Sequence, residues 1–182
     1  MRHLPNIICL LRIALIWPIV EGLLGRHFER TLLLFIVAAV SDGVDGYLAK
    51  TYGWQSRLGK LLDPLADKLL LVSVFLVLTW IGLTPRWLTV VAVARDVMIG
   101  AGAVLFRVAW GPLHGRPIFS SKLNTLLQLL YVSVVILHGA LGQPPQTVID
   151  ALAVLTLLTV LISGFAYLRE FTSRALQAAT PG

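Results

Sequence analysis

Six apolar stretches follow one another along the chain, and they constrain its fold more than any other feature. They cover residues 6–24, 31–50, 61–81, 87–106, 120–141 and 147–168. An α-helix needs roughly 20 predominantly apolar residues to cross the hydrocarbon core of a bilayer. We therefore predict an all-α integral membrane protein, a bundle of six transmembrane helices in which residues 1–182 form a single domain.

Composition excludes the soluble classes. Charged residues make up 13% of the 182 residues and hydrophobic residues 57%, whereas about a quarter of a soluble domain is charged. A soluble enzyme and a disordered chain are therefore excluded. The first stretch resembles a signal peptide, but it lacks a small-residue cleavage site and contains Arg12 and Pro18, so we keep it as a helix. A single cysteine, Cys9, excludes an internal disulfide.

Lysine and arginine residues set the expected orientation, because cytoplasmic loops carry an excess of them. With a cytoplasmic N-terminus, nine of these residues fall on the cytoplasmic side and three, Arg26, Arg30 and Arg86, fall on the other. We therefore expect both termini in the cytoplasm, as an even number of spans requires. The formal net charge of +6 then reflects topology and contact with anionic lipid, so nucleic acid is not an expected partner.

Four of the nine acidic residues lie within 26 positions, inside stretches that are otherwise apolar. Asp42 and Asp45 sit late in the second stretch, and Asp63 and Asp67 sit early in the third. Spacings of three and four residues place each pair on one helical face. The short connection around Gly53 makes the two helices antiparallel neighbours, so the four carboxylates should converge near the cytoplasmic end of this pair.

Carboxylates within membrane spans are costly, and by default they mark functional sites. One interpretation is an ion-pair network with the nearby cations Lys50, Arg57, Lys60 and Lys68. We favour a divalent metal site, because carboxylate oxygens suit magnesium or manganese. Four carboxylates could hold two ions, an arrangement that typically stabilises the attacking and leaving oxygens at a phosphorus.

A longer pattern surrounds these aspartates. It reads Asp42-x-x-Asp45-Gly46-x-x-Ala49-Lys50, then eight residues, then Gly59-x-x-x-Asp63-x-x-x-Asp67. This pattern resembles the signature of the CDP-alcohol phosphotransferase family of membrane enzymes, and the likeness covers nearly the whole chain. One position departs, because the family usually has arginine in place of Lys50. Lysine keeps the charge but loses the bidentate fork of arginine.

The resemblance implies a metal-dependent transfer of a phosphatidyl group from CDP-diacylglycerol to an alcohol in phospholipid biosynthesis, with release of CMP. It implies that two ions, Mg²⁺ or Mn²⁺, are bound by Asp42, Asp45, Asp63 and Asp67. It also implies that the donor pocket is formed by Gly46, Ala49, Lys50 and Gly59. Asp67 is the candidate general base, although a carboxylate beside two cations is a better ligand than a base.

Within this family, the second half of the chain is most similar to the cardiolipin synthases of the eukaryotic type. The matching stretches are residues 94–98, residues 119–125 with Gln128, and residues 163–167. They favour phosphatidylglycerol as the acceptor and cardiolipin as the product. The alternative acceptor is glycerol-3-phosphate, as in the phosphatidylglycerophosphate synthases, which share the aspartate motif and some of the region around Arg95.

Four basic residues are candidates to bind the phosphate of the acceptor, namely Arg12, Arg95, Arg116 and Lys122. Arg95 lies within a span and needs an anion or another polar partner. We expect that Asp96 cannot supply it, because adjacent residues face different sides of a helix. The alternative for Arg95 is an ion pair with a motif aspartate. Arg116 and Lys122 could instead be charges that only set topology.

Other chemistries and protein classes fit the sequence less well. No histidine is followed two positions on by lysine, so the His-x-Lys chemistry of phospholipase-D-like cardiolipin synthases is excluded. No P-loop pattern occurs, which argues against nucleotide hydrolysis of that type. An ion-coupled transporter would place its site near the midplane, on discontinuous helices of two repeated halves. No transit peptide precedes the first span, which favours the bacterial inner (cytoplasmic) membrane over mitochondria, with the active site facing the cytoplasm. The family implies a homodimer, for which the sequence carries no interface signal.

Overall fold

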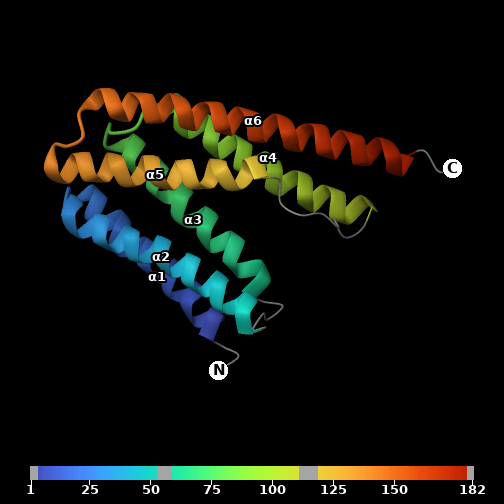
Figure 1. Ribbon diagram of the computed structural model, residues 1–182, viewed down its shortest axis with the longest axis horizontal. Helices are drawn as coiled ribbons and strands as arrows, with labels where there is room; N and C mark the ends of the chain where they lie inside the picture. The colour runs from blue at the N-terminus through green and yellow to red at the C-terminus, as the bar shows by residue number, and fades with distance from the viewer. Residues whose placement is uncertain (1–3, 53–58, 111–118, 180–182) are drawn as a thin grey trace. The chain divides into compact units, whose positions relative to one another are not determined.

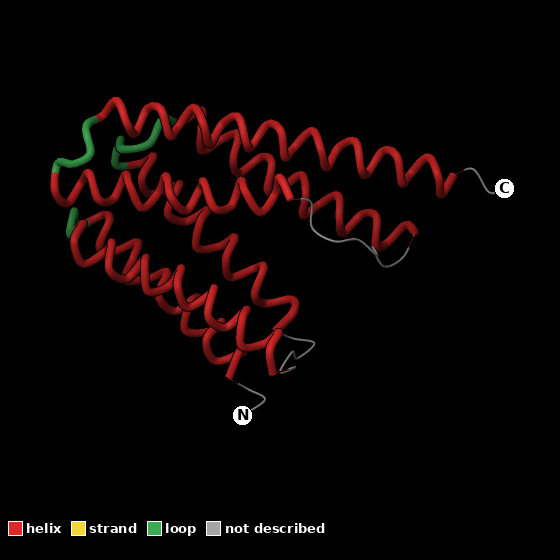
Figure 2. Tube along the Cα trace, viewed as in Figure 1, coloured by secondary structure: helices red, strands yellow, loops and turns green. Residues whose placement is uncertain are grey.

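A computed structural model describes the backbone of residues 4–52, 59–110 and 119–179. It describes the side chains of residues 9–41, 65–106, 108 and 119–173. Between short turns, every residue so described is helical, and no strand occurs among these residues (Figure 2). The prediction of an all-α chain is confirmed.

Six helices follow one another through the described part of the chain (Figure 1). They are α1 (Leu4–Leu24), α2 (Phe28–Tyr52), α3 (Gly59–Trp80), α4 (Arg86–Trp110), α5 (Phe119–Leu141) and α6 (Gln146–Ala179). Each coincides with one apolar stretch of the sequence. The largest difference lies in α6, which runs for 34 residues to Ala179, whereas its apolar stretch ends at residue 168. Its last turns contain charged residues such as Arg169 and Glu170, which lower the hydropathy but still favour a helix.

Three helices are long and apolar enough to cross a membrane, judged over the described residues. The candidate spans are Arg86–Phe106 in α4, Phe119–Leu141 in α5 and Gln146–Ser173 in α6. They mark the chain as an integral membrane protein. The helices α1, α2 and α3 have 21, 25 and 22 residues. At about 1.5 Å per residue, each has the length to cross a core of about 30 Å. That these three also span the membrane, and that both termini are cytoplasmic, stay predictions.

A left-handed residue joins α1 to α2. Arg26 has a φ of 57°, and the His27 N–H donates to the carbonyl oxygen of Gly22 at 2.8 Å. This bond is typical of a Schellman helix end, where glycine normally takes the positive φ. Gly82 does so, with a φ of 83°, after α3. Arginine takes that position after α1, and the turn returns the chain along α1, which contacts both α2 and α3.

The helices divide into two compact units that interleave along the chain. The first unit contains Met1–Pro85 and Val132–Ile149, and the second contains Arg86–Tyr131 and Asp150–Gly182. The helix α5 therefore belongs to both. Cys9 is buried in the first unit and forms no disulfide. In the second unit α4 and α6 pack closely at Gly102, where a Cβ would lie 2.6 Å from the ring of Phe171.

A substitution at Gly22 tests how closely α1 packs against α2. A Cβ at Gly22 would lie 2.3 Å from Thr31 Oγ1. Thr31 is fully buried, and its hydroxyl donates to the His27 carbonyl oxygen at 2.8 Å. We expect Gly22→Val to lower the free energy of unfolding by about 2 kcal/mol, since overpacking a filled interior costs roughly 1–3 kcal/mol. Thermal unfolding in detergent measures the loss.

Gly100→Val is the matched control, because nothing lies within 4 Å of a Cβ placed at Gly100. It makes the same substitution in another helix and should leave the melting temperature near that of the wild type. Equal melting temperatures for the two variants would contradict the close approach of α1 and α2.

Candidate active site

The four aspartates that the sequence singles out lie on two consecutive helices of the first unit. Asp42 and Asp45 fall in the second half of α2, and Asp63 and Asp67 fall in the first half of α3. Both helices are continuous through these positions, so each pair shares a helical face, as predicted. The side chain of Asp67 is described, whereas those of Asp42, Asp45 and Asp63 lie outside the described residues. The convergence of all four carboxylates stays a prediction.

The residues expected in the donor pocket belong to the same two helices. Gly46, Ala49 and Lys50 are part of α2, and Gly59 is the first residue of α3. Their surroundings lie outside the described residues, and Arg116 lies in a stretch whose backbone is also outside them. The roles of these five residues stay predictions.

Asp67 forms an ion pair with Arg12, in which Arg12 Nη1 donates to Asp67 Oδ1. The Arg12 side chain is 1% exposed and that of Asp67 is 32% exposed. One cation at this motif carboxylate thus comes from α1, a helix that the expected ion-pair network did not include. Breaking a buried ion pair leaves an uncompensated charge, so Asp67 has a structural role besides any role in catalysis. Arg12, a candidate for the acceptor phosphate, lies beside the motif.

The donor chemistry of Asp67 fits a divalent ion. Its carboxylate oxygens are hard ligands that suit magnesium or manganese, and its side chain is 32% exposed, so a ligand can reach it. Among the described side chains, no group of three or more His, Cys, Asp or Glu residues comes together. The other three motif carboxylates lie outside that set.

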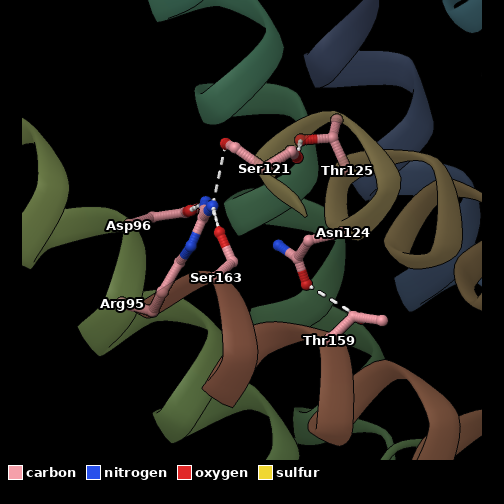
Figure 3. Close-up of polar contacts among 7 residues, drawn as sticks. All are labelled: Arg95, Asp96, Ser121, Asn124, Thr125, Thr159 and Ser163. Carbon is pink, nitrogen blue, oxygen red and sulfur yellow. Dashed lines mark hydrogen bonds and ion pairs between the residues drawn. The ribbon is translucent and has the colours of Figure 1, made fainter. Parts of the chain in front are cut away.

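Arg95 organises a second polar cluster, within the second unit (Figure 3). Its Nη1 donates to Asp96 Oδ1 at 2.7 Å. Its Nη2 donates to Ser121 Oγ at 2.8 Å and also to Ser163 Oγ. The ring of Tyr167 has its centroid 5.8 Å from the guanidinium carbon. These side chains come from α4, α5 and α6, so three helices fix one guanidinium, and Arg95 is only 5% exposed.

The ion pair of Arg95 with Asp96 shows that the expectation for these neighbours was wrong. Successive side chains leave a helix about 100° apart. The arginine side chain is long enough to reach back around α4, so its guanidinium meets the adjacent carboxylate. The anion that this arginine needs within its span is therefore supplied by the next residue.

Two polar stripes extend the Arg95 cluster, and the residue-by-residue prediction of the site missed them. On α5 and α6 the stripes consist of Ser121, Asn124 and Gln128, and of Thr156, Thr159 and Ser163. Spacings of three and four residues place each stripe on one helical face. Polar residues at this spacing in apolar stretches are the signal by which the sequence could have revealed them. Thr159 Oγ1 donates to Asn124 Oδ1 at 3.2 Å.

The cluster retains unused hydrogen-bonding capacity. Asn124 Nδ2, Gln128 Oε1, Thr156 Oγ1 and Arg95 Nε are buried and have no hydrogen-bond partner among the described residues. A buried unsatisfied group costs about 1–3 kcal/mol, and in folded proteins such groups are usually bonded to water or another polar partner. The arrangement is therefore suited to a polar or anionic ligand.

Lys122 is the fourth candidate for the acceptor phosphate. It lies on α5 next to Ser121, but it is exposed, whereas the Ser121 hydroxyl accepts a hydrogen bond from Arg95. The structure brings Arg95 together with Ser121 and Ser163 and places Lys122 on another face of α5. Both interpretations of Lys122, phosphate ligand and topological charge, stay predictions.

The chain is similar to a family of known proteins over most of its length. The family model described as CDP-alcohol phosphatidyltransferase matches residues 2–166. The match includes the four motif aspartates, Arg12 and the Arg95 cluster as far as Ser163. It therefore covers both groups of polar residues.

Similar curated proteins fall into two groups by name. A cardiolipin synthase (CMP-forming) of Rattus norvegicus is 29% identical over 180 residues, which are 90% of this chain and 60% of the rat protein. A CDP-diacylglycerol–glycerol-3-phosphate 3-phosphatidyltransferase of Bacillus subtilis is 33% identical over 155 residues, 76% of this chain and 79% of that protein. A probable phosphatidylglycerophosphate synthase of Mycobacterium tuberculosis is 30% identical over 166 residues, 86% of this chain and 78% of that protein. The chain thus spans 60% of the length of its rat relative.

Proposed function

We propose, because the chain belongs to the CDP-alcohol phosphatidyltransferase family, that it transfers a phosphatidyl group from CDP-diacylglycerol to an alcohol and releases CMP. The motif of four aspartates, within a family match over residues 2–166, is the observation that carries the proposal. The acceptor oxygen attacks the phosphorus that bears diacylglycerol, and the bond from that phosphorus to the CMP oxygen breaks. CMP leaves with that electron pair, and the hydroxyl proton passes to a base.

The aspartates supply both ligands and a base in this proposal. Two divalent ions, Mg²⁺ or Mn²⁺, would be held by Asp42, Asp45, Asp63 and Asp67. When bound, such ions neutralise the diphosphate and stabilise departing CMP. Asp67 accepts the proton of the acceptor hydroxyl, while Arg12 holds the Asp67 carboxylate in position. The donor is bound by Gly46, Ala49, Lys50 and Gly59.

The favoured acceptor is phosphatidylglycerol, which would make the chain a cardiolipin synthase. The likeness to the rat cardiolipin synthase, over 90% of this chain, supports it. Glycerol-3-phosphate is the alternative, supported by 33% identity to the Bacillus enzyme. Both acceptors carry a phosphate, and a guanidinium binds phosphate well. The proposed phosphate ligands are Arg12, Arg95, Arg116 and Lys122.

We place the protein in a bacterial inner membrane, with six spanning helices and with the aspartates and both termini on the cytoplasmic side. The excess of nine over three cationic residues on that side supports the orientation. A homodimer is the assembly that we expect from the family. An ion-coupled transporter is the distant alternative, and it predicts no CMP release.

Release of CMP by the purified chain tests the proposal. CDP-diacylglycerol and magnesium or manganese are supplied with phosphatidylglycerol, with glycerol-3-phosphate or with no acceptor, and a chelator is added as a control. Metal-dependent release that requires phosphatidylglycerol supports a cardiolipin synthase. Release that requires glycerol-3-phosphate supports the alternative. No metal-dependent release with either acceptor contradicts the proposed activity.

Lys50→Arg tests the one departure from the family pattern. We expect kcat/KM for CDP-diacylglycerol to stay within about threefold of the wild type, since arginine keeps the positive charge and adds a bidentate fork for phosphate. Steady-state CMP release measures it. A collapse of activity would mean that the donor pocket is shaped around lysine, and the role carried over from the family would fail at this position.

A further inference from the structure

An open groove of about 440 Å³ runs between α4 and α6 within the second unit. Its walls come from residues 90–98 of α4 and residues 160–168 of α6. Among the described residues that line it, Arg95 is the one charged side chain and the others are apolar. The groove thus combines a long apolar surface with a single guanidinium.

Small residues keep this groove open. A Cβ added at Gly164 would come within 3.7 Å of Arg95 Cγ and 3.8 Å of Met98 Cε. These are ordinary van der Waals contacts, so the packing of the helices does not require glycine there. Ala94 presents only a methyl group to the groove and is exposed. A larger side chain at either position would fill space that the native chain leaves free.

The composition of the two helices indicates that the groove faces the hydrocarbon of a bilayer. Both of its walls belong to candidate membrane spans, Arg86–Phe106 and Gln146–Ser173. Val90 and Phe165 line the groove and are 65% and 72% exposed, as suits side chains that face lipid. An acyl chain seated between two helices gains dispersion contacts on two sides instead of one.

Arg95 gives the groove hydrogen-bond donors that suit the head group of an anionic amphiphile. Asp96, Ser121 and Ser163 bind its two Nη atoms, and its Nε has no hydrogen-bond partner among the described residues. A guanidinium has five N–H donors, and the two serine hydroxyls can rotate. The cluster therefore has capacity for a phosphate oxygen in addition to its present contacts.

Arg95 lies deep in the span, so a lipid whose phosphate binds there has its acyl chains beside the groove. Arg95 lies eleven residues before Phe106, where the candidate span of α4 ends on the proposed cytoplasmic side, or about 16 Å along the helix axis. A lipid phosphate drawn to this depth displaces its own acyl chains from their usual place in the leaflet. Those chains then need an apolar surface beside Arg95.

We propose that the groove between α4 and α6 binds an acyl chain of the acceptor, so that the acceptor is a diacyl phospholipid and not a free glycerol phosphate. The inference rests on the proposed function and names the class of molecule that occupies the acceptor site. Gly164 and Ala94 set this preference, because their small size keeps the groove open beside Arg95.

Gly164→Leu tests the groove in steady-state CMP release by the full chain, with long-chain phosphatidylglycerol as the variable acceptor. We expect the acceptor KM to rise about tenfold, from the loss of roughly two methylenes of contact, while the KM for CDP-diacylglycerol stays within about twofold. Gly100→Leu is the matched control and should change neither constant, since a Cβ at Gly100 meets nothing within 4 Å. If the leucine variant does not fold, Gly164→Ala should raise the acceptor KM about threefold.

Acceptor chain length separates an acyl site from an indirect effect on Arg95. A short-chain phosphatidylglycerol does not fill the groove, so Gly164→Leu should raise its KM less than about twofold. Equal rises with short and long chains would mean that leucine acts through Arg95, and would overturn the proposal. A rise in the KM for CDP-diacylglycerol in place of the acceptor KM would assign the groove to the donor and overturn it too, as would an unchanged acceptor KM.

Release of CMP by the wild-type chain distinguishes failure of this inference from failure of the proposed function. Release of CMP with glycerol-3-phosphate and none with phosphatidylglycerol would overturn the phospholipid acceptor but leave phosphatidyl transfer standing. No metal-dependent release with either acceptor would overturn the proposed function itself.

Discussion

Asp63→Asn is expected to abolish turnover and to leave a folded membrane protein. Asparagine keeps the shape of the side chain but removes the negative charge that a divalent ion requires. Losing one charge-stabilising donor at an active site typically lowers kcat by about 100- to 1000-fold, and we expect a loss at or beyond the upper end of that range. The rate of CMP release at matched protein concentration measures the activity, and thermal unfolding in detergent reports the fold.

Asp150→Asn is the control for this variant. Asp150 is an exposed carboxylate in the first turns of α6, outside the motif. Its replacement removes one negative charge from the chain without touching the proposed ligands, so turnover should stay near the wild-type rate. Turnover of Asp63→Asn near the wild-type rate at high magnesium would count against the metal site as proposed.

Asp67→Asn is expected to cost stability as well as activity. The Arg12 side chain is 1% exposed and has Asp67 as its carboxylate partner, so the substitution leaves a guanidinium in the interior without that charge. Breaking a buried ion pair costs about 3–5 kcal/mol, and we expect about 2–3 kcal/mol because Asp67 is partly exposed. A lower melting temperature than that of Asp63→Asn, measured in the same detergent, is the expected result.

The double variant Arg12→Leu with Asp67→Asn separates the two roles of Asp67. Replacing a buried ion pair by groups without charge is often neutral for stability, so the double variant should recover most of the melting temperature. Turnover should stay lost, because the proposed ligand and base are still missing. If the double variant melts no higher than Asp67→Asn alone, Arg12 does not depend on this carboxylate, and the structural role assigned to the pair is wrong.

Hydropathy predicted the helices because a chain in lipid must satisfy its backbone hydrogen bonds internally. It could not predict the end of α6, since residues such as Arg169 and Glu170 lower the apolar score while they still favour a helix. It also could not predict the two units. Which helices pack together depends on local fits such as Gly22 against Thr31, and periodicity within one helix does not record such fits.

The candidate site was predicted only where the sequence spacing is short. The aspartates are three or four residues apart, so their shared faces follow from the geometry of one helix. Arg12 lies 55 residues from Asp67, and Ser163 lies 68 residues from Arg95. Such pairs depend on tertiary packing. The prediction that Arg95 and Asp96 would not pair was wrong although the two residues are adjacent. Cβ directions say little about where a long, flexible side chain can reach.

The interleaving of the two units has a consequence for how the protein is made. The chain passes between units after Pro85, Tyr131 and Ile149, so the first unit is incomplete until residues 132–149 have left the ribosome. Synthesis proceeds at about 5–20 residues per second, and α1–α3 must therefore wait for seconds in the membrane while the middle of the chain is still being inserted. The second unit closes last, with α6. A nascent chain stalled after α4 holds neither unit whole, because the first unit still lacks residues 132–149 and the second still lacks α5 and α6.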